Sequence, residues 1–229
     1  MLVIALLMTI LLGHAATHVR SNIVDISWPN CREKLADYRT GIIGVTGGRN
    51  FHPNPCLASE SSHIQNYAVY INTGYPGKAY GRHFQYSPRH CAYNDTYCLA
   101  YNYGYNEALY AIHYANLNDV HTDTWWLDVE TLNSWSDNFL ANRFFINGAV
   151  AGIKQNIWSA KAGIYSAPLQ WQQLMGPWKV KLPEWLATGG SSQAAATQAC
   201  HNKAFTGGKI ELTQYTQDLD QNILCHQRK

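Results

Sequence analysis

Segment 124–130 is an apolar run with two carboxylates at its end, and this pattern predicts a buried β-strand. Successive side chains of a strand point to opposite faces, so one face of this strand is apolar throughout. That face consists of Trp125, Leu127 and Val129. The other face places the carboxyl groups of Asp128 and Glu130 close together, with the indole of Trp126 beside them. Buried carboxyl groups are costly unless they have partners or water, so this strand is the first candidate for a functional site.

Two neighbouring carboxyl groups are the catalytic residues that most glycoside hydrolases use. One carboxyl group acts as general acid, and the other stabilises positive charge on the sugar. Closeness supports this division, because one negative charge raises the pKa of its neighbour and keeps it protonated near neutral pH. The alternative is that Asp128 and Glu130 lie solvated in a loop just past a strand and have no chemical role.

Strands and helices alternate along the rest of the chain. Further strands are expected at residues 23–27, 41–46, 68–73, 162–166, 182–187, 210–215 and 220–224. Helices are expected at 31–39, 59–66, 105–115, 139–157 and 194–199, and a long irregular loop at 75–103. Ser134 with Asp137 forms a possible capping box before the fourth of these helices.

This alternation predicts an α/β fold with a parallel sheet, in a single domain without an internal linker. Seven or eight strands in about 210 residues point to a small closed or nearly closed β/α barrel, since such barrels start near about 200 residues. Right-handed crossovers place the C-terminal ends of the strands on one rim. Four carboxylates lie at or just beyond predicted strand ends, and they are Asp25, Asp128, Glu130 and Asp220. Their convergence would form a deep acidic cleft.

Composition narrows the range of functions. Apolar residues make up 46% and charged residues 14% of the 229 residues, which is typical of a globular chain. The 15 tyrosines and 8 tryptophans suit either core packing or a sugar-binding cleft. The net charge is +2 and no basic run occurs, so a nucleic-acid partner has little support.

The first sixteen residues are expected to be a secretory signal peptide. Residues 1–12 are an apolar run, and small residues follow at Ala15 and Ala16, although no Lys or Arg precedes the run. A membrane anchor is the alternative, but the run is short for a membrane span. We therefore predict a secreted protein whose single domain covers residues 17–229, with no membrane association after cleavage.

Six cysteines fit an oxidising compartment, and fifteen pairings are possible. The short spacing favours a Cys91–Cys98 disulfide, and we expect Cys31–Cys56 and Cys200–Cys225 for the rest. A zinc site is the competing interpretation, but neither C-x-x-C nor H-E-x-x-H occurs, so no metal is expected. Asn94 starts an N-glycosylation sequon within the 91–98 loop.

The chain resembles the glycoside hydrolase family 25 lysozymes (N-acetylmuramidases) over nearly all of its expected mature length. The resemblance rests on six short segments in the family's order, which are Val24–Ser27, Leu127–Glu130, Ile164–Ser166 with Trp171, Trp185–Ala187, Gln214–Tyr215 and Asp220–Asn222. It implies a flattened TIM-like barrel whose late strands lack full helices. The sequences at 46–49 and 72–74 and the three disulfides depart from the family pattern, which marks a divergent branch whose glycan need not be peptidoglycan.

The resemblance also implies roles for single residues. Glu130 would be the general acid, and Asp128 would stabilise the 2-acetamido group or the oxocarbenium-like centre, with Asp25 and Asp220 completing the acidic floor. The residues expected to contact sugar are Tyr70, Asn72, Trp126, Tyr165, Trp171, Gln214 and Tyr215. The predicted activity is hydrolysis of β-1,4 bonds in an N-acetylated amino-sugar polymer, with peptidoglycan as the first candidate, by a monomer without a cofactor.

Two alternatives remain open. A chitin-directed hydrolase of glycoside hydrolase family 18 would carry D-x-x-D-x-D-x-E, and Asp123, Asp128 and Glu130 fit that motif, but Trp126 stands where an Asp is needed. A secreted carbohydrate-binding protein without activity could use the same barrel and the same aromatic residues. Such a protein has no need of four carboxylates at the strand ends, which favours the enzyme.

Overall fold

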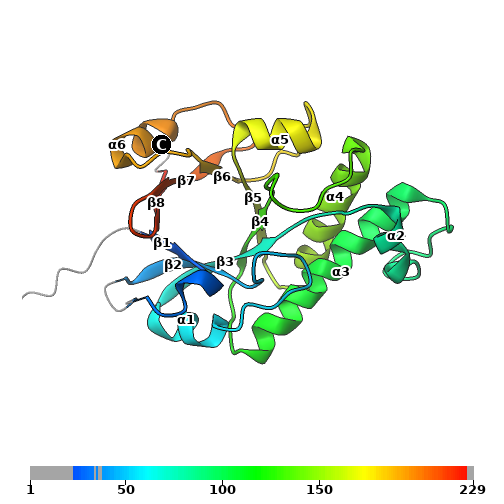
Figure 1. The fold of residues 1–229 in the computed structure, drawn as a ribbon, viewed down its shortest axis with the longest axis horizontal. Helices are drawn as coiled ribbons and strands as arrows, with labels where there is room; N and C mark the ends of the chain where they lie inside the picture. The colour runs from blue at the N-terminus through cyan, green and yellow to red at the C-terminus, as the bar shows by residue number, and fades with distance from the viewer. Residues whose placement is uncertain (1–22, 34, 36–37, 226–229) are drawn as a thin grey trace, which may run out of the picture.

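The computed structural model describes residues 23–33, 35 and 38–225, which form a closed barrel of eight strands (Figure 1). The strands are β1 (Ile23–Ile26), β2 (Thr40–Gly44), β3 (Asn66–Asn72), β4 (Thr124–Asp128), β5 (Lys161–Ser166), β6 (Glu184–Ala187), β7 (Ile210–Thr216) and β8 (Asp220–Leu224). Neighbours from β1 to β7 are parallel, whereas β8 is antiparallel to both β7 and β1. The first residue of β8 therefore lies on the rim that holds the C-terminal ends of the other strands. The predicted α/β barrel is confirmed, in its closed form.

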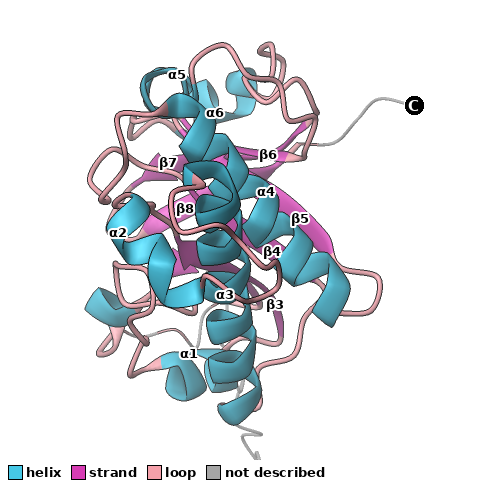
Figure 2. Cartoon of the chain, turned by 90° about the vertical axis from the view of Figure 1, so that its right-hand side faces the viewer, coloured by secondary structure: helices cyan, strands magenta, loops and turns pink. Residues whose placement is uncertain are grey.

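Helices cover the barrel unevenly. They are α1 (Leu57–His63), α2 (Lys78–Gly81), α3 (Thr96–Leu117), α4 (Phe139–Asn156), α5 (Pro168–Met175) and α6 (Gln193–Ala199), with 3-10 helices η1 (Trp28–Asn30) and η2 (Arg82–Phe84). The two long helices, α3 and α4, lie side by side along one flank (Figure 2). The helix after β6 has only seven residues, and a short turn replaces a helix between β7 and β8. The expectation that the late strands lack full helices agrees with this arrangement.

The two faces of β4 have the environments that its alternation predicts. Trp125, Leu127 and Val129 are buried in the large core between the sheet and the outer helices. Trp126 points into the barrel, where it packs in a second apolar cluster with Ile42, Trp185 and Leu212. Gly163 on the neighbouring strand makes room for this indole, because a Cβ there would lie 2.2 Å from Trp126 Cζ3. The apolar cluster closes the barrel below the carboxylates.

Several predicted elements differ from the structure. The helix expected at 31–39 is wrong, since the described residues of that range contain no helix and the short helical turn is η1, just before them. Cys31 is tied to Cys56 there, and three apolar residues are too few to bury a helical face. The loop expected at 75–103 is shorter, because it contains α2 and η2 and because α3 already begins at Thr96.

Two helix starts also need correction. The cap of α4 is Asn138, whose side chain accepts hydrogen bonds from the backbone N–H groups of Leu140 and Ala141, and not the Ser134–Asp137 box. Helix α5 was not predicted, although Pro168 at its start is a favourable first residue of a helix.

Three disulfides join the predicted pairs of cysteines, Cys31–Cys56, Cys91–Cys98 and Cys200–Cys225. The first links the β1–β2 connection to the start of α1, the second closes the loop before α3, and the third ties the end of α6 to the residue after β8. The expected signal peptide, residues 1–16, lies outside the described residues. Among the residues that are described, no helix is long and apolar enough to cross a bilayer.

Candidate active site

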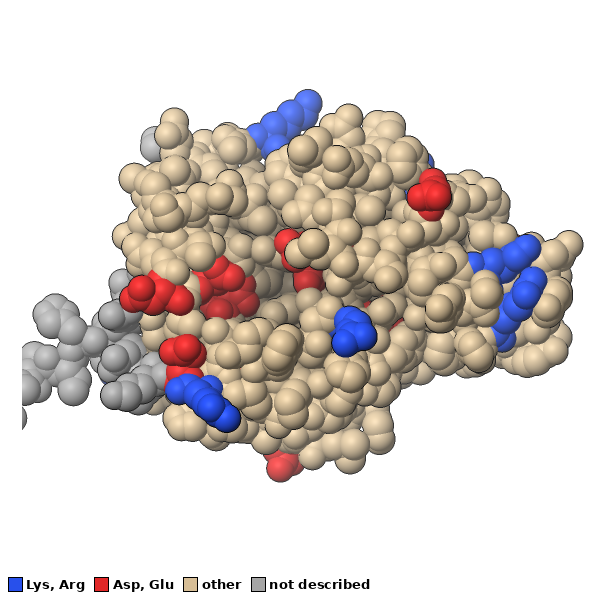
Figure 3. Space-filling view, viewed as in Figure 1, with Lys and Arg blue, Asp and Glu red and all other residues tan. Residues whose placement is uncertain are grey.

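Four carboxyl groups surround one cavity at the C-terminal rim of the barrel. The cavity has a volume of about 310 Å³, and Asp25, Asp128, Glu130 and Asp220 all line it. Asp25 on β1 stands opposite Asp220 in the β1–β8 register, and Asp128 ends β4. Figure 3 shows acidic side chains gathered around a hollow on the face that Figure 1 presents. The rim thus brings together the four carboxylates that the sequence predicts at strand ends.

Asp128 is held by an amide whose orientation is fixed. Asn72, at the end of β3, donates its Nδ2–H to Asp128 Oδ2. The Asn72 carbonyl oxygen in turn accepts from Thr46 Oγ1 and from the backbone N–H of Gly48, both at 3.0 Å. These two donors fix which side of the amide faces Asp128. The other carboxyl oxygen, Oδ1, is buried and has no hydrogen-bond partner among the described residues.

Glu130 lies two residues past Asp128, where the strand has ended. Its backbone carbonyl accepts from Trp135 Nε1 at 2.9 Å, and its side chain hydrogen-bonds with Gln170 of α5. The Gln170 carbonyl oxygen accepts from the backbone N–H of Thr131 at 2.6 Å. That contact leaves the amide N–H of Gln170 to face Glu130. Glu130 is more accessible than Asp128, which is 3% exposed.

The opposite wall holds a second carboxyl–amide pair. Gln214 on β7 donates its Nε2–H to Asp25 Oδ2 and accepts from the Tyr165 hydroxyl at 2.7 Å. Asp220 accepts from Thr216 Oγ1 at 2.7 Å. Asp25 is reachable from the cavity but is otherwise enclosed.

Three aromatic rings contribute to the lining of the cavity. Tyr70, Tyr165 and Trp185 all line it. The Tyr165 and Trp185 ring centroids are 4.3 Å apart, and the Tyr70 ring lies 6.1 Å from that of Trp185. Apolar ring surface beside hydrogen-bonding groups is the usual lining of a small-ligand pocket.

The neighbouring carboxyl groups of Asp128 and Glu130 both have a raised pKa. Burial raises the pKa of Asp128 well above its usual range, and the neighbouring Glu130 raises it further, against the Asn72 hydrogen bond. The pKa of Glu130 is raised by burial, with a further contribution from Asp220 against the Gln170 hydrogen bond. Because the two groups interact, they titrate as a pair. The pair therefore retains a proton at higher pH than an isolated carboxyl group would.

Sequence comparison identifies the family. The profile of the family described as "Lysozyme-like protein 1" matches residues 91–206, just over half of the 229-residue chain. The chain belongs to the lysozyme-like protein 1 family. That segment includes β4, Glu130 and Tyr165. No curated protein sequence matches the chain.

Solved structures with the same fold support this assignment. A muramidase from Trichobolus zukalii is 14% identical with a TM-score of 0.58, over 89% of this chain and 92% of that one. A glycosyl hydrolase 25 of Streptococcus pneumoniae, described as a virulence factor participating in host cell invasion, is 15% identical with a TM-score of 0.53, over 90% of this chain and 88% of that one. At these identities the likeness shows a shared fold. The resemblance to glycoside hydrolase family 25 is confirmed at that level, and the lysozyme-like family makes the chain a glycoside hydrolase.

Three residues expected to contact sugar lie away from the cavity. Trp126 belongs to the apolar cluster below it. Trp171 packs in the outer core, where its indole stacks on that of Trp178. Tyr215 is 1% exposed, and it points out of the barrel because it follows the inward-facing Gln214. These three residues lie outside the cavity lining, whereas Tyr70, Asn72, Tyr165 and Gln214 line it.

Other lining residues were not predicted. Ser27, Pro29 and Asn30 follow β1 and form the edge of the cavity, and Trp185 lies inside it. The inward position of Trp185 could have been predicted, because its neighbours on β6 point outward. The hydrogen bond from Gln170 to Glu130 could not, because it depends on helix α5, which the sequence pattern does not predict. Among the described residues, no three His, Cys, Asp or Glu side chains are placed to hold one metal ion.

Neutralising Asp25 is expected to stabilise the lysozyme-like fold at neutral pH. Burial raises the pKa of Asp25 well above its usual range, and the nearby Asp220 raises it further. The folded chain therefore binds this proton more tightly than the unfolded chain does. The resulting stability is fully present below the unfolded pKa and is lost as pH rises through the folded pKa. The side chain of the Asp25→Asn variant can still accept a hydrogen bond from Gln214. Because an amide does not ionise, the variant does not lose this stability as pH rises.

Thermal unfolding across pH measures this effect. We expect the Asp25→Asn variant to melt above wild type at pH 7 by about 2–4 °C or more, the shift that 1 kcal/mol gives in a chain of this size. The difference should vanish near pH 3. Asp218→Asn, a change at an exposed carboxylate of the β7–β8 turn, serves as the control. An Asp25→Asn variant that melts below wild type at pH 7 would contradict the assignment.

Proposed function

We propose that the chain is a secreted glycosidase that hydrolyses β-1,4 bonds in an N-acetylated amino-sugar polymer, with peptidoglycan as its substrate. The observation that carries this proposal is the convergence of Asp25, Asp128, Glu130 and Asp220 on one cavity in a chain of the lysozyme-like family. A sugar ring is neutral and does not need four acids to bind it. Carboxyl groups with raised proton affinity are useful where a proton must be delivered and positive charge must be stabilised.

Glu130 is the proposed general acid. It is the more accessible member of the Asp128–Glu130 pair, and its raised pKa keeps it protonated where an ordinary glutamate would be ionised. It donates its proton to the glycosidic oxygen as the bond from that oxygen to the anomeric carbon breaks. The Glu130 carboxylate then takes a proton from the water that completes hydrolysis, which restores the acid.

Asp128 is the proposed stabilising carboxylate. Burial and Glu130 raise the pKa of Asp128 and the Asn72 hydrogen bond to its Oδ2 acts against them, so Asp128 is the anion of the pair when their shared proton lies on Glu130. An anion at this position stabilises the oxocarbenium-like centre, or accepts from the N–H of the 2-acetamido group. Asp25 and Asp220 complete the acidic floor, and Tyr70 and Tyr165 with Trp185 offer ring faces to the sugar.

The remaining predictions fit a secreted enzyme. Residues 1–16 are proposed as a cleaved signal peptide and residues 17–229 as one monomeric domain. Three disulfides suit an oxidising compartment. Asn94 is exposed in the disulfide loop, where an oligosaccharide could be attached. A carbohydrate-binding protein without activity, or a chitin-directed hydrolase, would use the same cavity.

Product analysis separates these functions. The secreted protein is incubated with purified peptidoglycan and with purified chitin, and the released reducing ends are identified by mass spectrometry. We expect muramic acid reducing ends from peptidoglycan. Fragments from chitin alone would support the chitin-directed alternative, and two intact polymers that merely retain the protein would overturn the proposed hydrolase.

A further inference from the structure

A basic and tyrosine-rich segment lies between β3 and α3, and residues 78–93 are called the basic lobe here. It contains Lys78, Arg82 and Arg89 with two histidines, and no Asp or Glu. Three of its tyrosines are strongly exposed, with 53% for Tyr80, 66% for Tyr86 and 61% for Tyr93. Figure 3 shows Lys and Arg side chains gathered at the end of the molecule where Figure 1 draws α2, away from the acidic hollow.

Each of the two arginines of the lobe places its guanidinium carbon over an aromatic ring. The Arg82 Cζ atom is 3.7 Å from the centroid of the Tyr93 ring, and the Arg89 Cζ atom is 3.4 Å from that of Tyr101. A stacked guanidinium group keeps its N–H donors in the plane of the group, where they can reach a carboxylate or phosphate. Arg82 therefore lies beside an exposed ring, and Arg89 is anchored on the buried ring of Tyr101.

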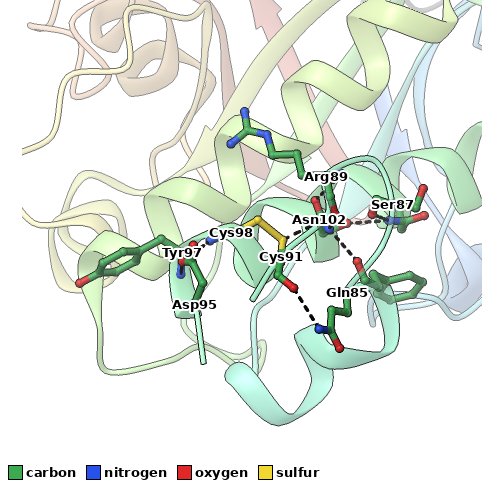
Figure 4. The surroundings of a disulfide bond; sticks show 10 residues. Gln85, Ser87, Arg89, Cys91, Asp95, Tyr97, Cys98 and Asn102 are labelled. Carbon is green, nitrogen blue, oxygen red and sulfur yellow. Dashed lines mark hydrogen bonds between the residues drawn. A yellow bond between two sulfur atoms is a disulfide. The ribbon is translucent and has the colours of Figure 1, made fainter. Parts of the chain in front are cut away.

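Hydrogen bonds from α3 and a disulfide hold the backbone of the lobe in place (Figure 4). Asn102 of α3 donates its amide N–H groups to the carbonyls of Phe84 and Arg89, both at 2.7 Å. The Cys91–Cys98 disulfide and two hydrogen bonds between Gln85 and Cys91 fasten the end of the segment. A surface ordered before binding loses less conformational entropy when a ligand arrives.

The lobe begins six residues after the end of β3. It follows β3, whose last residue, Asn72, holds Asp128. The cavity repels anionic groups, whereas the lobe attracts them. A polymer matches both surfaces if its scissile bond, bound in the cavity, is neutral and its anionic groups lie farther along the chain, where they meet the lobe.

We propose that the basic lobe binds an anionic glycan, whose sugar rings lie on the exposed tyrosines and whose carboxylate or phosphate groups accept from Arg82, Arg89 and Lys78. This inference names the class of polymer that the proposed hydrolase would recognise, and in that sense it rests on the proposed function. The binding step itself does not require hydrolysis.

Binding is measured with full-length chain carrying Glu130→Gln, so that hydrolysis does not interfere. The probes are polygalacturonate, poly(glycerol phosphate) and neutral dextran, titrated at low and at high salt. One variant adds Lys78→Ala, Arg82→Gln and Arg89→Gln, and the matched control removes the exposed charges of Lys154, Lys161 and Lys203 instead. We expect the lobe variant to lose about 10-fold or more in affinity at low salt, because each cation that is lost removes a counterion-releasing contact.

The outcome separates the inference from its rivals. The control should bind like the parent, dextran should not bind, and high salt should weaken binding of the parent. Preference between the two anionic probes identifies carboxylate or phosphate as the recognised group. Equal loss in both variants, no binding of either anion, or equal binding of dextran would overturn the inference. If the lobe variant melts below the parent, the single changes at Lys78, Arg82 and Arg89 are compared instead. A protein that binds an anionic probe but hydrolyses no polymer would refute the proposed hydrolase and would still support anion binding by the basic lobe.

Discussion

Replacing Glu130 with glutamine is expected to lower kcat/KM on the β-1,4-linked polymer by about 10²–10⁴-fold, the contribution of a positioned general acid. Glutamine has nearly the same shape and can keep a hydrogen bond with Gln170, but it has no proton of suitable acidity to donate. The loss should appear mainly in kcat, since proton transfer occurs in the transition state. Turbidity decrease of a cell-wall suspension measures it.

A matched control distinguishes the role of Glu130 from its charge. Glu211→Gln removes an exposed carboxylate of β7 at the other end of the barrel, and it should leave activity unchanged. The Glu130→Gln variant should melt at or above the temperature of wild type, because burial already disfavours the charged form of Glu130. Normal activity of the Glu130→Gln variant would refute the assignment of the acid.

Replacing Asp128 with asparagine is expected to lower kcat by about 10²–10³-fold, on the scale of one preorganised electrostatic contact. The asparagine carbonyl can still accept from Asn72, whose orientation Thr46 and Gly48 maintain. The side chain therefore keeps its place and loses only its charge. KM should change little if Asp128 acts in the transition state, and initial rates over a range of polymer concentration separate the two parameters.

The pH profile of the Asp128→Asn variant provides a second readout. Without Asp128, the second step of the pair's titration disappears and Glu130 titrates alone, with its pKa still raised by burial and by Asp220, so the alkaline limb of activity should move to lower pH. Asp123→Asn, at an exposed site before β4, is the control. An unmoved profile with full activity would contradict coupling between the two carboxyl groups.

The barrel rim could be predicted because local patterns fix it. Alternation along 124–130 assigns Trp125 to the outside and Asp128 to the inside, and the structure agrees. Right-handed crossovers then bring the C-terminal ends of parallel strands together, so Asp25 and Asp128 meet without any knowledge of side-chain contacts. Asp220 joins them although β8 is antiparallel, because it begins that strand and does not end it.

The parts that sequence reasoning missed depend on distant packing. Trp171 and Tyr215 are aromatic residues of the kind that line sugar sites, but both are buried outside the barrel. The position of α5 places Trp171 in the outer core. The alternation of side chains along β7 points Tyr215 away from the cavity. Gln170 reaches Glu130 only because α5 packs over the end of β4. No local sequence pattern predicts such a contact, because its two residues belong to different elements that meet only in the folded chain.

The most direct test of Glu130 as general acid compares two leaving groups. The Glu130→Gln variant is assayed on the β-1,4-linked polymer and on a dinitrophenyl glycoside of the same N-acetylated sugar, whose phenolate departs without protonation. The account predicts a loss of about 10²–10⁴-fold on the polymer and little loss on the activated glycoside. An equal loss on both substrates would show that Glu130 does not protonate the leaving oxygen.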